Sequence, residues 1–355
     1  MTRNIFYGTL KTLPRLLCIM GSIAIMLLFP REISQGVKEG IVLCGEKIIP
    51  SLFPFMILAS YISSSSALER CIFVFDKLSR RLFRVNAYGL TAVILGFLGG
   101  YPIGAKAVCD FYTAKRLSQD EATRLLPWCI NPGPAFVITA VGAFMLGSTK
   151  IGVIMYASII CSSVSIGIAC RFLGKNIQNE KREKIPFHTT GNFVYSVASA
   201  TDSMLSICGW VLMFSAISKA LCILIKNKLL SLFICSVAEV TTGCVTLTNA
   251  SMPIPLICAI LGFGGFAVIF QVAPYVEKCS CSLKRFIFWK AVNGILSGFY
   301  CSLLLRIYPV SISTSVTSQL STGTPALSHS LTAAVLLVII CIVFILEVDY
   351  KKKIC

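Results

Sequence analysis

The sequence predicts an all-helical, polytopic membrane protein with re-entrant or broken helices. Hydrophobic residues make up 56% of the 355 residues and charged residues only 13%, and the mean hydropathy is +0.82. A soluble globular chain does not have this composition. The apolar residues form runs long enough to cross a bilayer, and short basic clusters separate these runs. Within some of the runs, glycine and proline are dense enough to break a helix.

Charge and cysteine content narrow the class of protein further. The net charge of +17 is spread over clusters between apolar runs, which is typical of cytoplasmic loops and not of a nucleic-acid-binding domain. The lipid bilayer is therefore the expected partner, and no nucleic acid is expected. Most of the 17 cysteines lie inside apolar runs, so we expect them to be reduced packing residues. Cys279 and Cys281 form a close pair with no histidine near them, so neither a metal nor a cofactor is expected.

Loop charge predicts the orientation of the first spans, because basic loops stay in the cytoplasm. A span at 13–29 follows a basic segment and therefore runs outward. The segment 33–49 is amphipathic or re-entrant, and a second span at 50–66 crosses back. The loop 69–84 carries five basic and two acidic residues, which places it in the cytoplasm, in agreement with the first span.

The segment 87–105 is long enough to cross, but a full crossing would place the basic loop 171–184 outside. A re-entrant segment that enters and leaves on the cytoplasmic side removes this conflict; both forms stay open here and at 229–250. Ser118 and Glu121 then fit a capping box that begins an amphipathic helix. Further spans are predicted at 128–147 and 151–173.

The second half of the chain repeats this order in the opposite orientation. An amphipathic stretch at 193–203 is followed by a span at 204–225, a broken segment at 229–250 and a glycine-rich span at 254–276. The basic residues Lys284, Arg285 and Lys290 then return the chain to the cytoplasm. This arrangement is typical of an inverted-topology repeat in secondary transporters, whose substrate lies where the two broken segments meet.

Five parts of the chain follow from this pattern, and both termini are expected in the cytoplasm. The last part contains spans at 291–308 and 330–346. The parts are an N-terminal transmembrane helix (1–30), a first repeat with a connecting span (31–173), a basic cytoplasmic loop (174–190), a second, inverted repeat (191–278), and a C-terminal transmembrane pair with a basic tail (279–355).

The candidate binding residues of the first half surround a predicted helix break. The start of a half-helix exposes backbone N–H groups, which together with the helix dipole attract a carboxylate or phosphate. Lys106 would add a positive charge or face lipid headgroups, and the amide of Asn131 offers both a donor and an acceptor. Close helix packing through small residues is the alternative for the glycines. The candidates are Gly99, Gly100, Tyr101, Pro102, Gly104, Lys106, Asn131 and Gly133.

Glu239 is the candidate coupling-ion residue of the second half, because it is the only charged residue in 229–276 and a charge at membrane depth is costly. It is expected to bind a coupling cation, a proton or a substrate donor; a structural carboxyl is the alternative. Lys219 lies near the end of its span and is expected to reach the interface. The candidate substrate residues beside Glu239 are Thr241, Thr242 and Gly243, while Gly262, Gly265 and Gln271 either bind or pack.

An enzyme is not expected. His188 and His329 are the two histidines, and both fall in predicted loops. A His-Glu-x-x-His zinc motif and a Walker sequence are both absent, and a membrane-embedded Ser-His protease would need a histidine at membrane depth.

The motif Gly-Gly-Tyr-Pro-Ile-Gly-Ala-Lys at 99–106, followed by Asn-Pro-Gly-Pro at 131–134, resembles the YlbJ-type sporulation integral membrane proteins. These proteins belong to the nucleoside-recognition (Gate) domain superfamily, which is related to the concentrative nucleoside transporters. The resemblance covers roughly 36–278, so the two predicted repeats would each be Gate-like. The chain departs from the expected motif at Gly99 and Gly133, where serine hydroxyls would be expected.

The resemblance implies transport of dipicolinate, a small aromatic dicarboxylate, across a membrane around the developing endospore. Such a substrate agrees with an anion site at glycine-rich half-helix starts. Glu239 would repel it unless the carboxyl is protonated or holds a cation, which is why a coupling-ion site is expected there. A nucleoside or other small-metabolite carrier and a non-transporting subunit of a sporulation complex are the alternatives, and a homo-oligomer stays open.

Overall fold

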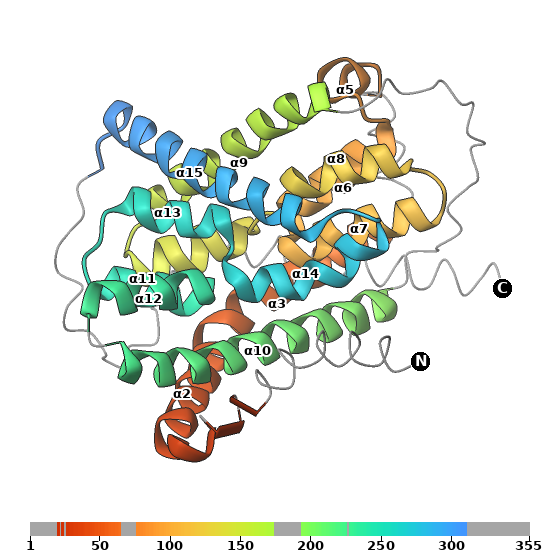
Figure 1. Ribbon diagram of the computed structural model, residues 1–355. Coiled ribbons are helices and arrows are strands. Elements are labelled where there is room, and N and C mark those ends of the chain that lie inside the picture. The colour runs from red at the N-terminus through yellow and green to blue at the C-terminus, as the bar shows by residue number, and fades with distance from the viewer. Residues whose placement is uncertain are drawn as a thin grey trace, which may run out of the picture. The chain divides into compact units, whose positions relative to one another are not determined.

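The computed structural model (Figure 1) describes residues 20–64 except 22 and 25, residues 76–173, and residues 193–310 except 226. This described part is helical and contains no strand. Five of its helical segments are long and apolar enough to cross a membrane, which confirms the predicted polytopic helical class. Predicted features at 174–190 and 330–346, and most of the span at 13–29, lie outside the described residues. The five segments are Pro30–Leu58, Thr149–Cys170, Phe193–Cys222, Ile254–Lys278 and Leu283–Ile307.

The first described helices form one uninterrupted helical path. It consists of α2 (Pro30–Leu43), the π-helical η1 (Cys44–Ile48) and α3 (Ile49–Ser64). The predicted boundary between the segment at 33–49 and the span at 50–66 is therefore not marked by a break in the helix. At the junction the N–H of Cys44 still donates to the carbonyls of Gly40 and Ile41, so the backbone bonds continue through η1.

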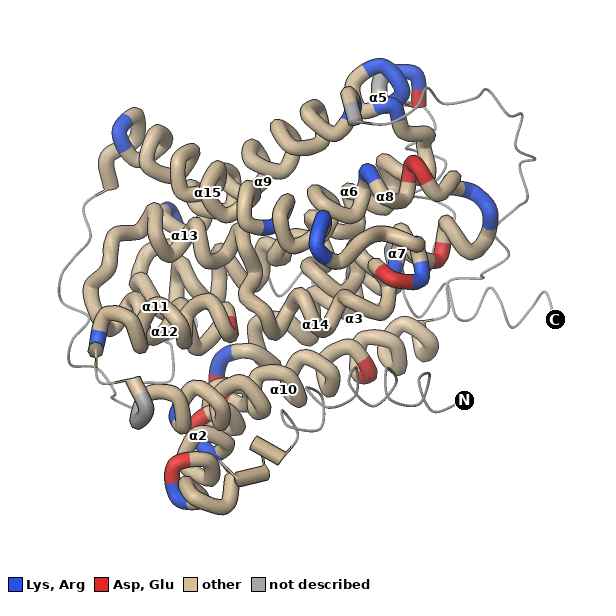
Figure 2. The backbone as a smooth tube through the Cα atoms, viewed as in Figure 1, with Lys and Arg blue, Asp and Glu red and all other residues tan. Residues whose placement is uncertain are grey.

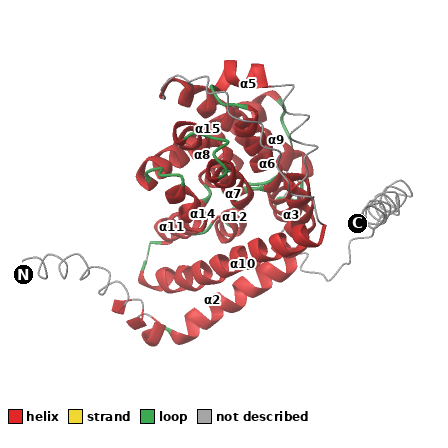
Figure 3. Ribbon diagram, turned by 90° about the vertical axis from the view of Figure 1, so that its right-hand side faces the viewer, coloured by secondary structure: helices red, strands yellow, loops and turns green. Residues whose placement is uncertain are grey.

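Helix α10 (Phe193–Leu224) packs along α2 and α3, and Figure 3 shows α2 and α10 side by side. Gly36 lets the two backbones approach, because a Cβ there would lie 2.7 Å from the carbonyl oxygen of Ser215. Lys219 Nζ on α10 lies 2.8 Å from Glu39 Oε1 on α2. Lys219, which was predicted to reach the membrane interface, thus has Glu39 as an ion-pair partner.

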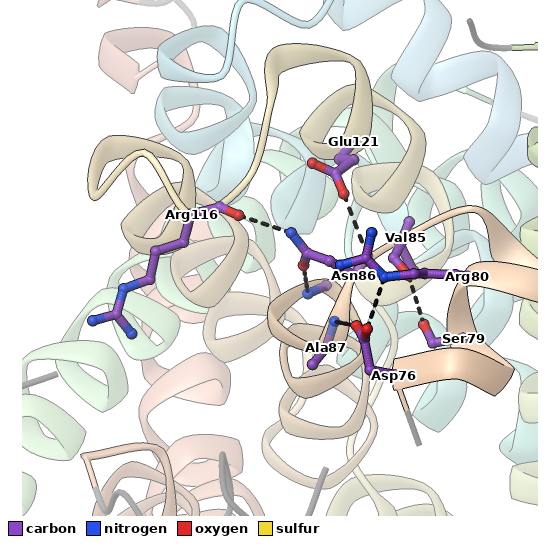
Figure 4. A network of polar contacts seen from close by, with 9 residues as sticks. Asp76, Ser79, Arg80, Val85, Asn86, Ala87, Arg116 and Glu121 are labelled. Atoms are coloured by element: carbon purple, nitrogen blue, oxygen red, sulfur yellow. Dashed lines mark hydrogen bonds and ion pairs between the residues drawn. The ribbon is translucent and has the colours of Figure 1, made fainter. Parts of the chain in front are cut away.

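A polar network (Figure 4) joins the short helix α5 (Asp76–Phe83) to the start of α6 (Ala87–Gly99) and to the first turn of α8 (Gln119–Cys129). Asn86 caps α6, its amide donates to the carbonyl of Arg116, and its own N–H donates to Glu121. Asp76 accepts from the N–H of Ala87 at 2.7 Å. Helix α8 (Gln119–Cys129) begins with the predicted capping box of Ser118 and Glu121, which is confirmed.

Two short helices joined by a single residue follow α5. Helices α6 (Ala87–Gly99) and α7 (Tyr101–Thr113) meet at Gly100 and pack side by side as a hairpin. The predicted break in the Gly-Gly-Tyr-Pro element is confirmed. The chain then runs through α8, an irregular stretch at 130–134 and the π-helical η2 (Ala135–Met145), so the Asn-Pro-Gly-Pro element also interrupts its predicted span.

The same order of elements recurs after α10. Helices α11 (Lys228–Ala238) and α12 (Val240–Asn249) meet at Glu239 and pack side by side as a second hairpin. Helix α13 (Ile254–Phe263) is then separated from α14 (Gly265–Lys278) by Gly264. A long helix ends each series: α9 (Thr149–Cys170), continued by the 3-10 turn η3 (Arg171–Leu173), ends the first, and α15 (Leu283–Ile307) ends the second.

Helices α9, α13 and α15 pack against one another in the core. The two hairpins lie on opposite sides of the view in Figure 1, with α6 and α7 to the right and α11 and α12 to the left. Figure 2 shows that lysine and arginine gather around α5, the α7–α8 turn and the α14–α15 turn. We call this region the basic end; its residues include Arg80, Arg84, Lys115, Arg116, Lys278, Lys284 and Arg285.

Candidate functional site

The two hairpin tips each contact the helix break of their own half. The first tip touches the first break, since a Cβ at Gly133 would lie 3.3 Å from the backbone nitrogen of Gly100. The second tip touches the second break, since a Cβ at Gly265 would lie 3.1 Å from the backbone nitrogen of Val240. Gly100 has φ +88 and Gly264 has φ +87, a region that L side chains rarely adopt, so glycine is required at both positions.

A cavity lies between the two tips and the two breaks. Its wall also includes Trp210 of α10, Phe136 of η2 and several aliphatic side chains, so apolar surface dominates it. Seven of the predicted site residues line the cavity: Gly99, Gly100, Tyr101, Pro102, Gly133, Glu239 and Thr241. The structure thus brings residues predicted from both halves of the sequence to one place.

Two of the predicted glycines serve helix packing instead. Gly104 lies against Gly96 and the carbonyl of Cys129, and a Cβ there would lie 2.5 Å from that carbonyl oxygen. Gly243 occupies the matching place in the second hairpin, where a Cβ would lie 2.7 Å from the Cα of Ser236. Both glycines hold the two helices of a hairpin together, and neither lines the cavity.

Glu239 is 2% exposed and acts as the N-cap of α12. Its Oε1 accepts the N–H of Thr241 at 2.8 Å, and its Oε2 accepts the N–H of Thr242. The side chain of Thr242 turns away from the cavity, toward the hydroxyl of Ser215 at 3.2 Å. A carboxylate at this position is stabilised by the positive end of the helix, and it already occupies the amides that an anionic substrate would need.

The start of α7 differs from the start of α12. Its N-cap is Gly100, and no side chain caps it. Tyr101 and Pro102, the first two residues of α7, line the cavity. The first hairpin therefore presents an uncapped helix N-terminus to the same space in which the second hairpin presents a carboxylate.

The first break releases two carbonyl groups that distant side chains bind. In a continuous helix the carbonyls of Trp128 and Ile130 would accept from residues 132 and 134, but both are proline and have no N–H. Asn131 Nδ2 donates to the carbonyl of Trp128 at 2.7 Å, and Lys290 Nζ donates to the carbonyl of Ile130 at 2.8 Å. Asn131 is 1% exposed and does not line the cavity, so it supports the break from behind.

The second break releases two carbonyls in the same way. The hydroxyl of Tyr101 donates to the carbonyl of Leu261 at 2.7 Å, and Asn293 Nδ2 donates to the carbonyl of Gly262 at 3.1 Å. Asn293 Nδ2 also lies 3.0 Å from Asn131 Oδ1, so the supports of the two breaks are hydrogen-bonded to each other. Tyr101 therefore has a structural hydroxyl, and only its ring side is available to the cavity.

No family model matches the chain, and no solved structure matches it. The chain is 21% identical over 320 residues to the sporulation integral membrane protein YlbJ of Bacillus subtilis (strain 168), a match that covers 78% of each protein. This similarity supports the predicted resemblance to the YlbJ-type sporulation membrane proteins.

The sequence analysis missed two residues that support the helix breaks. Lys290 was assigned to a cytoplasmic cluster, which is wrong: it is 0% exposed, and its Nζ lies 5.5 Å from the ring centroid of Tyr101. Asn293 was not considered, although it is also 0% exposed. Both lie at helical spacing on one face of α15, and this signal could have indicated that they point into the core.

Two further polar residues, Lys106 and Gln271, lie next to or on the wall of the cavity between the hairpin tips. Lys106 Nζ donates to the hydroxyl of Ser199 at 3.0 Å and lies beside the cavity instead of on its wall. Gln271 does line the cavity, and its Nε2 is buried without a hydrogen-bond partner. A buried amide N–H₂ that lacks an acceptor is a donor available to a bound solute.

Proposed function

We propose that the chain is a transporter that moves a small anionic solute across a bilayer. Dipicolinate is the candidate substrate, and a membrane around the developing endospore is the candidate location. The observation that carries this proposal is the cavity between two hairpin tips and two helix breaks, in a chain whose helices are long and apolar enough to span a membrane. The sporulation protein YlbJ, which the chain resembles, supports the cellular setting.

We further propose that the two series of elements are inverted-topology repeats like those of concentrative nucleoside transporters. The recurring order of hairpin, interrupted helix and long helix supports this. The position of the hairpins supports it as well. The first hairpin ends at the α7–α8 turn, which belongs to the basic end, whereas the second hairpin ends at 250–253, on the side away from the basic end. The positive-inside rule then places the basic end in the cytoplasm.

Electrostatics and shape favour an anion with a flat ring. The uncapped start of α7 faces the cavity and contributes positive potential, which favours a carboxylate. The rings of Trp210 and Phe136 offer apolar surface to an aromatic solute. The unpartnered Nε2 of Gln271 supplies a further donor.

Glu239 is proposed to hold a coupling cation or a proton. Two of its lone pairs are used by the amides of α12, and a carboxylate has two more that remain for a cation beside the cavity. A bound cation would also remove the repulsion between Glu239 and an anionic solute. The carrier role, in place of enzymatic chemistry, is part of the same proposal.

Uptake of labelled dipicolinate into proteoliposomes that contain the purified chain tests the proposal. Saturable uptake that unlabelled dipicolinate competes, and that empty liposomes lack, is the expected result. If the chain takes up nucleosides but not dipicolinate, the substrate is a nucleoside and the dipicolinate proposal is wrong. If the chain takes up neither solute and a stable partner is recovered by pull-down, the chain is a non-transporting membrane subunit and the transporter proposal is wrong.

The role of Glu239 has its own test. Glu239→Gln should abolish the dependence of uptake on pH or sodium, because the amide cannot bind a cation or a proton as the carboxylate does. If uptake and its pH and sodium dependence stay as in the wild type, Glu239 has the helix-capping role alone.

A further inference from the structure

A second, more polar cavity lies beside the first. It is enclosed by α7, α10 and α14, and its wall includes Lys106, Ser199, Asp202, Ser203 and Tyr275. Pro102 and Gln271 line both this space and the inner cavity, so the two spaces adjoin at these side chains.

The position of the second cavity connects the inner cavity with the basic end. Lys106 lies on α7 between the hairpin tip and the α7–α8 turn, and Tyr275 lies one turn before Lys278 at the end of α14. Ser199 lies in the second turn of α10, close to its start at Phe193. Going outward from Pro102 and Gln271, all three helices therefore lead to the same end of the protein.

The chemistry of α10 indicates that this space holds water. Ser199, Asp202, Ser203 and Ser206 occupy positions i, i+3, i+4 and i+7, which form one polar stripe along a span of high mean hydropathy. A polar stripe on a membrane-spanning helix is stable where it faces partners or a water-filled cavity. Here it faces the second cavity.

Lys106 is the cation of this space. Among the residues that the structure describes, the polar group bonded to its ammonium is the neutral hydroxyl of Ser199, and no carboxylate forms an ion pair with it. Asp110, one turn further along α7, interacts electrostatically with Lys106, and Asp202 also lines the space, but neither carboxylate forms an ion pair with it. The nearby carboxylates reduce the positive potential at Lys106, so an anion binds there weakly. Weak binding is what a transient site requires, because the solute must be released again.

We propose that the second cavity is an aqueous vestibule through which an anionic solute passes between the basic end and the inner cavity, with Lys106 as its transient carboxylate-binding group. The identity of the solute rests on the proposed function, whereas the presence of water in this cavity does not. Pro102 and Gln271 form the boundary between the vestibule and the inner cavity.

Hydroxyl-radical footprinting of the full chain in nanodiscs tests the vestibule without any transport assay. Tyr275 and Tyr156 are both half-buried, but only Tyr275 lines the vestibule, while Tyr156 donates to the carbonyl of Phe97. Tyr275 should be oxidised several-fold faster than Tyr156. Equal protection of the two rings would overturn the vestibule, whatever the transported solute is.

Two substitutions test the passage of solute in proteoliposomes. Ser203→Trp fills the vestibule and should abolish dipicolinate uptake, whereas Leu205→Trp, on the 66% exposed outer face of the same helix, should preserve it. Lys106→Gln should raise the concentration for half-maximal uptake about three- to tenfold, the effect of one lost charge-assisted contact, and Lys106→Arg should restore it.

The outcomes separate this inference from the proposed function. If the wild-type chain transports and Ser203→Trp transports equally well, the route is wrong while the transporter stands. If no solute is transported but Tyr275 is oxidised faster than Tyr156, the aqueous vestibule stands while the proposed substrate is wrong. Wild-type affinity in Lys106→Gln would remove Lys106 from the route.

Discussion

Gly104→Ala separates a packing role from a binding role at a residue that was first predicted to bind substrate. A Cβ at Gly104 would lie 2.5 Å from the carbonyl oxygen of Cys129 and 2.9 Å from the Cα of Gly96. Both are backbone atoms, so α7 must move away from α6 and α8 to make room. Overpacking of this kind costs about 1–3 kcal/mol, while alanine in a helix gains about 0.5–1 kcal/mol over glycine. The expected net loss is about 1–2 kcal/mol.

Thermal unfolding of the detergent-purified variants measures this loss. At roughly 1–2 °C per kcal/mol for a chain of this length, Gly104→Ala should unfold about 1–4 °C below the wild type. Gly209→Ala is the matched control, because Gly209 lies inside α10 and a Cβ there meets nothing within 4 Å. This control should be as stable as the wild type or more stable. If both variants gain stability, the close approach of the first hairpin to α8 is refuted.

Three further predictions concern α2, α10 and α11. Gly36→Ala should lower the unfolding temperature, because its Cβ would lie 2.7 Å from a backbone carbonyl of α10; an unchanged temperature would contradict the close contact of α2 and α10. A double-mutant cycle on Glu39 and Lys219 should give a coupling of about 1 kcal/mol or less that salt reduces, because both side chains are over 40% exposed. Cys222 and Cys235, whose Sγ atoms lie 3.4 Å apart, should cross-link under a mild oxidant such as a dithiol disulfide, detected by mass spectrometry of the linked peptides. Absence of this linkage would place α10 and α11 further apart.

The helix breaks could be predicted because their causes are local. Pro132 and Pro134 remove the N–H groups that would continue the helix wherever the segment lies in the fold. Gly100 permits a φ of +88 that other residues rarely adopt. The composition likewise predicts a helical membrane protein, since only helices with internal backbone bonds cross lipid in such short apolar runs.

The division of roles among the predicted site residues could not be obtained from the sequence. Glycine in a broken segment looks the same whether it lines a cavity, as Gly133 does, or packs against a neighbouring helix, as Gly104 does. Glu239 looks the same as an ion ligand or as a helix cap, because its partners are the amides of its own chain and the space around it belongs to other helices. Tertiary contacts decided the roles of the two glycines, and the structure shows Glu239 capping α12 beside the cavity.

The sequence by itself thus determined the class, the resemblance to YlbJ-type proteins and the positions of the helix breaks, beginning with the Gly-Gly-Tyr-Pro element. Only the tertiary structure showed what stabilises those breaks. The carbonyl of Ile130 is bound by Lys290 and that of Leu261 by Tyr101, each 160 residues away in sequence. A freed carbonyl must find a donor in the membrane, but no local pattern specifies which one, because any donor that the fold brings within hydrogen-bond distance satisfies it.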